Sequence, residues 1–338
     1  MDGGEDEVKI AILEARRKLV IRDVQKPVLD KDEVLIKVQY CGVCGSNLHI
    51  YVEGIGIGLG HEFSGDIVEM GFEVDGWKIG DRVAINPRIP CGECYWCIRG
   101  EIGLCDKLFL SAIRGQGAFA TYAKAKYVQL YKLPGELMYE EGTMVEPTAC
   151  ALHAIKFSGM KVGDIVAVLG LGPIGLLIAQ LAKISGAKAV YGTEISPSRI
   201  ELAQNVVDLV IHPKVANPVD RILDLTGGMG PDIVFECAGN VETTQDSIAL
   251  VRRGGTVIIP GMCFEAVETS FIDVVLKGLT LRGSLAWSAG EYAMALELIK
   301  NRIIDVNPLI TDKFPLEDIN RAFDKALKGE GCKILVKP

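Results

Sequence analysis

Four cysteines lie close together in the stretch CGECYWCIRGEIGLC, namely Cys91, Cys94, Cys97 and Cys105. Four thiolates can close a tetrahedron around Zn²⁺ with no position left for water, which is the composition of a structural zinc site. An iron–sulfur cluster also uses four thiolates, but no other feature of the chain indicates electron transfer. We therefore predict a structural zinc ion that holds this lobe in place of a hydrophobic core.

A second set of metal ligands precedes this lobe in the stretch CGVCGSNLHIYVEGIGIGLGHEF. It contains Cys44 and His61, with Glu62 directly beside the histidine. An incomplete set of protein ligands is what a catalytic zinc needs, because water or substrate must occupy the open position. The sequence thus predicts two zinc ions per subunit, one structural and one catalytic.

A glycine-rich segment, AVLGLGPIGLLIAQ, follows these sites and contains Gly170, Gly172 and Gly175 in the pattern G-x-G-x-x-G, with Pro173 and Ile174 inside it. The segment follows an apolar stretch that we expect to be a strand and opens a predicted helix. Backbone N–H groups at the start of such a helix can hold a pyrophosphate. We therefore predict a dinucleotide-binding loop.

The choice between the two nicotinamide dinucleotides depends on Glu194, at the end of the next predicted strand. A carboxylate there accepts hydrogen bonds from the adenosine ribose hydroxyls and repels a 2′-phosphate, which favours NAD over NADP. Arg199 lies five residues further along and leaves a minor tolerance of NADP open. NAD is the predicted cofactor.

The elements that must position these residues change in character along the chain. Short apolar stretches with Gly and Pro between them predict β-strands up to about residue 90. After about residue 147, strand-like and helix-length segments alternate, which is typical of a parallel sheet with helices on both faces. The last segment is predicted to be helix, helix and strand.

Composition limits the class of protein. A chain of 338 residues predicts two domains, and the formal charge of −8 argues against binding to a nucleic acid backbone. No long apolar run indicates a membrane span, and the acidic start MDGGEDEVKI does not resemble a secretory signal. We therefore expect a cytoplasmic protein whose ten cysteines stay reduced.

Two segments carry a family resemblance. GHEFSGDIVEMGFEV resembles the Gly-His-Glu signature of the zinc-dependent medium-chain alcohol and polyol dehydrogenases, and CGVCGSNLH is similar to their Cys-x-Ser/Thr-Asp-x-His segment. The resemblance covers nearly the whole chain. It implies an α/β protein with a GroES-like β-barrel catalytic domain at residues 1–147 and 286–338. It also implies a Rossmann NAD-binding domain at residues 148–285, so that the C-terminal segment returns to the catalytic domain.

The resemblance also assigns roles to residues of the catalytic zinc site. Cys44 and His61 match the family's zinc ligands, and the third ligand is either Glu62 or Glu146 of the segment MVEPTACALHA. Such glutamates occur in the branch that includes sorbitol, butanediol and threonine dehydrogenases. Cys150 lies four residues past the matching position, and we interpret it as a thiol that packs within a helix.

The implied reaction is hydride transfer between NAD and a secondary alcohol or polyol, or the corresponding ketone. Ser46 and His49 are the candidate catalytic residues, since a hydroxyl and an imidazole can relay the alcohol proton out of the site. The family's usual aspartate is Asn47 here, which predicts a more loosely held catalytic zinc. A catalytically weakened or inactive NAD-binding homologue is therefore the alternative.

Two other hypotheses about the function are less favoured. A zinc-ribbon module that contacts nucleic acid disagrees with the acidic composition, and a metal-free reductase of the same fold disagrees with Cys44 and His61. We expect a small-molecule alcohol or ketone as substrate, no nucleic acid or membrane partner, and a homo-oligomer, with a tetramer favoured over a dimer.

Overall fold

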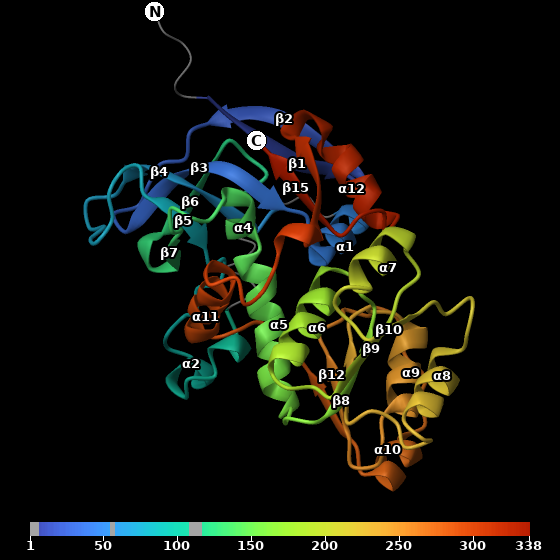
Figure 1. Cartoon of the computed structure of the whole chain (residues 1–338). Coiled ribbons are helices and arrows are strands. Elements are labelled where there is room, and N and C mark those ends of the chain that lie inside the picture. The colour runs from blue at the N-terminus through green and yellow to red at the C-terminus, as the bar shows by residue number, and fades with distance from the viewer. Residues whose placement is uncertain (1–6, 55–57, 108–116) are drawn as a thin grey trace, which may run out of the picture. The chain divides into compact units, whose positions relative to one another are not determined.

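The computed structural model describes residues 7–54, 58–107 and 117–338. It divides the chain into unit 1, which comprises Met1–Glu146 and Ser288–Pro338, and unit 2, which comprises Pro147–Trp287. Each unit has its own sheet (Figure 1). The candidate metal ligands belong to unit 1, and the glycine loop belongs to unit 2.

Unit 1 is built around one central strand, β3, which pairs with β15, β4 and β6. Its residues Val34, Leu35 and Ile36 are fully buried, as expected for a strand covered on both faces. The sheet order is β14-β15-β3-β4-β5-β7, and a separate antiparallel pair is formed by β1 and β2. The strands are β1 Glu7–Ala15, β2 Lys18–Gln25, β3 Glu33–Gly42, β4 Glu62–Met70, β5 Arg82–Ile85, β6 Tyr122–Lys126, β7 Leu130–Lys132, β14 Ile310–Pro315 and β15 Lys333–Lys337.

The C-terminal segment returns to unit 1, as the sequence predicted. Strand β15, red in Figure 1, lies beside the blue strand β3, with Val336 opposite Cys41. This pairing brings residue 333 next to the start of β4, although the two segments are far apart in the sequence. The helices of unit 1 are α1 Gly45–Glu53, α2 Tyr95–Ile98, α4 Tyr139–Thr143, α11 Ala289–Lys300 and α12 Ile319–Leu327, and α5 Val145–Ser158 begins in unit 1 and continues in unit 2.

Unit 2 has a six-stranded parallel sheet in the order β10-β9-β8-β11-β12-β13. The direction of winding reverses between β8 and β11, so α6 lies on one face of the sheet and α8 and α9 lie on the other (Figure 1). The elements are β8 Ile165–Leu169, α6 Pro173–Ile184, β9 Ala189–Thr193, α7 Pro197–Ala203, β10 Leu209–Ile211, α8 Pro218–Leu225, β11 Ile233–Glu236, α9 Val241–Leu250, β12 Thr256–Ile259, α10 Phe271–Lys277 and β13 Thr280–Gly283.

Within the described ranges, every helix is too short or too polar to cross a bilayer.

Candidate functional site

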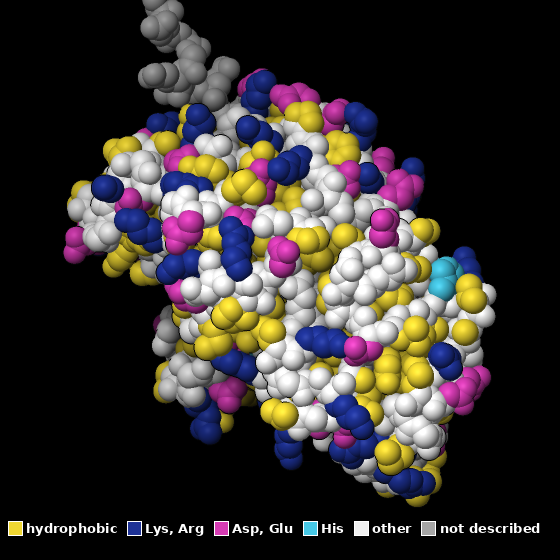
Figure 2. Space-filling view, viewed as in Figure 1, with side chains coloured by type: hydrophobic (Ala, Val, Ile, Leu, Met, Phe, Trp, Pro, Cys, Tyr) yellow, Lys and Arg dark blue, Asp and Glu magenta, His cyan; other side chains and the backbone are white. Residues whose placement is uncertain are grey.

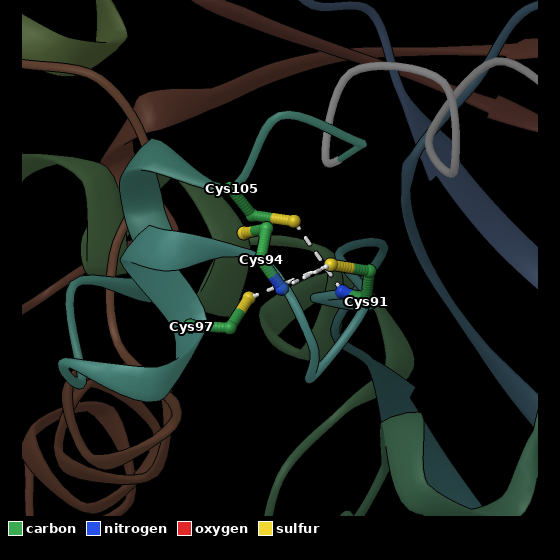
Figure 3. Close-up of side chains that lie close together, drawn as sticks. All are labelled: Cys91, Cys94, Cys97 and Cys105. Carbon is green, nitrogen blue, oxygen red and sulfur yellow. Dashed lines mark hydrogen bonds between the residues drawn. The ribbon is translucent and has the colours of Figure 1, made fainter.

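The four-cysteine lobe is positioned by one short helix and the turns around it. Cys94 precedes α2, Cys97 lies within α2, and Cys105 follows a 3₁₀ turn at Ile102–Leu104. The four sulfur atoms lie within 4.8 Å of one another and gather in one cluster (Figure 3). None of these cysteines forms a disulfide in the described structure.

Backbone N–H groups donate hydrogen bonds to two of the sulfur atoms in this lobe. Cys91 N donates to Cys105 Sγ at 3.3 Å, and Cys94 N donates to Cys91 Sγ at 3.4 Å. The Cys97 backbone N–H lowers the pKa of the Cys94 thiol to about 6. Four converging sulfurs of this kind fit a tetrahedral Zn²⁺ with no open position.

The second centre brings Cys44, His61 and Glu62 together, with one ligand atom from each within 4.8 Å of the others. Cys44 is the residue before α1, His61 directly precedes β4, and Glu62 is its first residue. Because β4 pairs with β3, the strand places His61 and Glu62 beside the end of β3, where the chain turns into α1. Sulfur, imidazole and carboxylate are the donor types that zinc takes in proteins, so this set also fits the metal.

Glu146 approaches the same centre from helix α5. Its Oε1 atom lies 3.8 Å from His61 Nε2, and the side chain is almost fully buried. Burial raises the pKa of Glu146 to about 8, so the carboxyl holds its proton until a cation is present to stabilise the charged form. Both candidate third ligands are therefore near His61.

The two glutamates differ in their partners. Glu62 is bound by Lys333, whose Nζ donates to Oε1 at 2.9 Å and to Oε2 at 2.6 Å. The same Nζ donates to the carbonyl of Val43 at 3.3 Å. Both oxygens of Glu62 are thus engaged by a cation, whereas Glu146 faces the imidazole of His61.

Lys333 is a part of the site that the sequence reasoning missed. It lies in the strand CKILVKP, where three apolar residues follow it, and it is 2% exposed. A lysine in an otherwise buried strand is a weak signal for a buried partner of opposite charge. Gly42 is also required here, because a Cβ at that position would collide with the Glu62 carboxylate.

Asn47 is buried in α1, and its Oδ1 atom has no hydrogen-bond partner among the described residues. The amide oxygen therefore does not accept the imidazole N–H of His61 in this structure. A buried acceptor without a partner is uncommon in folded proteins and often marks a functional site.

The candidate relay residues, Ser46 and His49, both lie on α1. They are three positions apart, which places them on neighbouring positions of the helix surface. Ser46 Oγ donates to Cys44 Sγ at 3.3 Å. Burial lowers the pKa of His49, so the imidazole is neutral at pH 7 and able to accept a proton.

The glycine loop of unit 2 joins β8 to α6. Gly170 has φ +94°, which is a left-handed conformation that favours glycine, and Gly172 is the residue before the helix. Pro173 takes the first helical position, where no backbone donor is needed, and Ile174 follows it. A Cβ on Gly175 would collide with the carbonyl of Gly170, so the loop packs tightly against the helix.

Glu194 connects the glycine loop with the end of β9. Its carboxylate accepts hydrogen bonds from Leu171 N at 3.1 Å, Ile195 N at 2.7 Å and Ser196 N at 2.9 Å. Arg199 lies above the loop, since its Nη1 atom is 3.7 Å from the position that a Cβ of Gly172 would take. The acidic and the basic residue are thus both close to the predicted pyrophosphate site.

Known proteins resemble this chain over nearly its full length. Residues 30–135 match the family described as alcohol dehydrogenase GroES-like domain, and residues 173–301 match that described as zinc-binding dehydrogenase. Sorbitol dehydrogenase of Bacillus subtilis is 33% identical, with 98% of this chain and 97% of that protein covered.

Solved structures of dehydrogenases also resemble this chain. A zinc-binding dehydrogenase of Sinorhizobium meliloti bound to NADP has a TM-score of 0.92 at 32% identity and covers 99% of this chain and 100% of its own. The 2R,3R-butanediol dehydrogenase of Bacillus subtilis has a TM-score of 0.88 at 32% identity and covers 98% and 99%. The predicted fold class, a GroES-like domain followed by a Rossmann-type sheet, is confirmed.

Proposed function

The chain belongs to the zinc-dependent medium-chain alcohol and polyol dehydrogenases, and on this premise we propose an NAD-dependent enzyme that interconverts a secondary alcohol or polyol with its ketone. The observation that carries the proposal is the convergence of Cys44, His61 and Glu62 in unit 1, with Glu146 Oε1 3.8 Å from His61 Nε2. Unit 2 adds a glycine loop that is hydrogen-bonded to Glu194. The comparisons give no support to the alternative of an inactive homologue.

The catalytic metal is assigned to Cys44 and His61, with one glutamate as third ligand. Zinc, when bound, supplies Lewis acidity toward the oxygen of the alcohol or ketone. Cys44 directly precedes α1 and His61 directly precedes β4, and ligands held at the ends of regular elements favour a fixed geometry. We assign the second, structural zinc to Cys91, Cys94, Cys97 and Cys105.

We propose that the proton of the alcohol leaves the site along helix α1. Ser46 lies next to the metal ligand Cys44, and neutral His49 is one helical turn further on. A hydroxyl can pass a proton on while it receives another, and an imidazole can release it to water. Ser46→Ala and His49→Gln are both expected to lower turnover and to leave zinc content unchanged.

NAD is the proposed cofactor, with NADP as the competing possibility. When bound, the nicotinamide accepts or returns the hydride. The buried carboxylate of Glu194 supports NAD, because a 2′-phosphate beside it would suffer repulsion. Two observations support NADP instead. The Sinorhizobium meliloti relative was bound to NADP, and Arg199 lies above the glycine loop.

A soluble homo-oligomer in the cytoplasm, with a tetramer favoured, completes the proposal. Strand β13 ends the sheet of unit 2, and the preceding helix α10 exposes apolar side chains of which 58–71% is accessible, namely Phe271, Ile272, Val275 and Leu276. An edge strand beside an apolar stripe supports burial against another subunit. Mixed basic and acidic side chains on the face shown in Figure 2, with the net charge of −8, support the absence of a nucleic acid partner.

One assay tests the proposed function. Reduction of NAD⁺ and NADP⁺ is measured with diols, sugar alcohols, threonine and simple secondary alcohols, with and without a chelator. Turnover that a chelator removes and added zinc restores supports the proposal. Turnover that resists the chelator, or no turnover with any substrate, would contradict it.

A further inference from the structure

Glu236 is a buried carboxylate that neither metal centre nor the predicted cofactor contacts use. It is the last residue of β11 and is fully buried. In the parallel sheet it lies opposite Leu169, the last residue of β8, so it borders the point where the sheet reverses its winding. In sheets of this type, a ligand binds outside the carboxyl ends of the strands at that point.

One oxygen of Glu236 organises the loop that follows β11. Oε1 accepts hydrogen bonds from Ala238 N at 3.0 Å, Gly239 N at 2.9 Å and Thr243 Oγ1 at 2.7 Å. Thr243 lies in the first turn of α9, so the carboxylate fixes both the loop and the start of the helix. A charged acceptor with three donors holds a loop more firmly than neutral hydrogen bonds do.

That loop is in contact with two others. A Cβ on Gly170 would lie 2.8 Å from Ala238 N, which shows how closely the glycine loop approaches. Gly239 has φ +69°, and a Cβ there would lie 2.9 Å from the backbone of Met262, in the loop after β12. Gly261 N also donates to the Glu236 carbonyl at 2.9 Å, so three loops meet at this residue.

The second oxygen, Oε2, has no hydrogen-bond partner among the described residues. It lies against Gly261, where a Cβ would collide with it. Burial of a carboxylate with one oxygen unpaired is unfavourable for stability, and such arrangements are concentrated at functional sites.

We propose that Glu236 is a positioning residue for the nicotinamide riboside half of the cofactor. This inference rests on the proposed NAD-dependent function. The sheet consists of two halves, and Glu194 places the adenosine half at β8 to β10. The loops after β11 and β12, which Glu236 joins, belong to the other half. Glu236 shapes the surface that receives the nicotinamide riboside without contact to the adenosine.

The test compares a whole cofactor with its adenosine half. Binding of NAD⁺ and of ADP to the full chain is measured by calorimetry for wild type, Glu236→Ala and Glu194→Ala. Loss of three hydrogen bonds to a charged acceptor predicts that Glu236→Ala weakens NAD⁺ about tenfold or more and changes ADP by less than about twofold. Glu194→Ala is expected to weaken both ligands. Glu236→Gln, which keeps an oxygen acceptor, is expected to restore most of the NAD⁺ affinity.

Other outcomes separate this inference from the proposed function. Equal weakening of NAD⁺ and ADP by Glu236→Ala, or no weakening of either, would overturn the role of Glu236 alone. If the wild type binds neither NAD⁺ nor NADP⁺ in the same calorimetric measurement, the proposed function is overturned instead. Should Glu236→Ala fail to fold, Thr243→Val removes one of the three hydrogen bonds and carries the same comparison, with a smaller selective loss of NAD⁺ expected.

Discussion

Lys333 and Glu62 form a buried ion pair in which one ammonium group binds both oxygens of the carboxylate. The lysine comes from the last strand of the chain and the glutamate from β4, so the pair joins the C-terminal segment to the candidate catalytic centre. The positive charge of Lys333 thereby balances the negative charge of Glu62 without a metal ion. We infer that Glu146, which faces His61, is better placed than Glu62 to serve as the third ligand.

The first prediction concerns this pair. Lys333→Met leaves the charge of Glu62 buried without its partner, and we expect a loss of about 3–5 kcal/mol in the free energy of unfolding. Urea denaturation of the metal-free protein measures it. Lys337→Met, an exposed position on the same strand, is the matched control and should change stability little. A loss below about 1 kcal/mol in Lys333→Met would show that the pair is not stabilising.

The sequence predicted those parts of the site whose residues are close together along the chain. The cysteine lobe and the glycine loop each lie within one short segment, so spacing alone indicates the chemistry that we propose for them. Lys333 and Glu62 are 271 positions apart, and no local pattern links them. The sequence also offered no indication of a role for Glu236. Its three hydrogen-bond donors are close to it in the sequence, but they follow no recognisable motif, and the neighbouring loops that give the residue its importance are distant in the sequence.

Asn47→Asp provides the second prediction. Near a bound zinc, a carboxylate at this position can accept the His61 N–H and add negative charge, so zinc retention is expected to rise about 10–100-fold. Without metal, the same carboxylate is buried at a position where Asn47 Oδ1 has no hydrogen-bond partner among the described residues, so it should destabilise the protein. Chelator competition and thermal unfolding of both forms measure the two effects. Equal zinc retention in the wild type and in Asn47→Asp would show that Asn47 does not loosen the metal.

The two proposed zinc sites are expected to respond differently to the loss of one thiol. Cys44→Ser should abolish turnover while NAD⁺ binding survives, because the catalytic ligand belongs to unit 1 and the glycine loop to unit 2. Cys97→Ser should lower thermal stability, because the lobe depends on its metal for structure. Zinc content per subunit should fall from about two to about one in both variants. The division into a catalytic and a structural site fails if both variants lose activity alone.

Cofactor preference is expected to depend on Glu194. Glu194→Ala removes the carboxylate that repels a 2′-phosphate and releases three backbone N–H groups near the glycine loop. The ratio of kcat/KM for NAD⁺ to that for NADP⁺ should therefore fall. Glu201→Ala, an exposed position on the following helix α7, serves as the control. If the ratio is unchanged in Glu194→Ala, discrimination between the two cofactors depends on other residues.

The stability of the metal-free protein should depend on pH through Glu146. Burial raises the pKa of this carboxyl from 4.5 to about 8 in the folded protein, so the folded state binds a proton that the unfolded state has released. A group with a raised carboxyl pKa stabilises the fold at low pH, and this contribution declines as pH rises from about 4.5 to 8. Glu146→Gln should remove this component, which urea denaturation at several pH values can measure. Zinc binding to the wild type should release the proton, so zinc affinity is expected to rise with pH over the same range and to lose part of that dependence in Glu146→Gln.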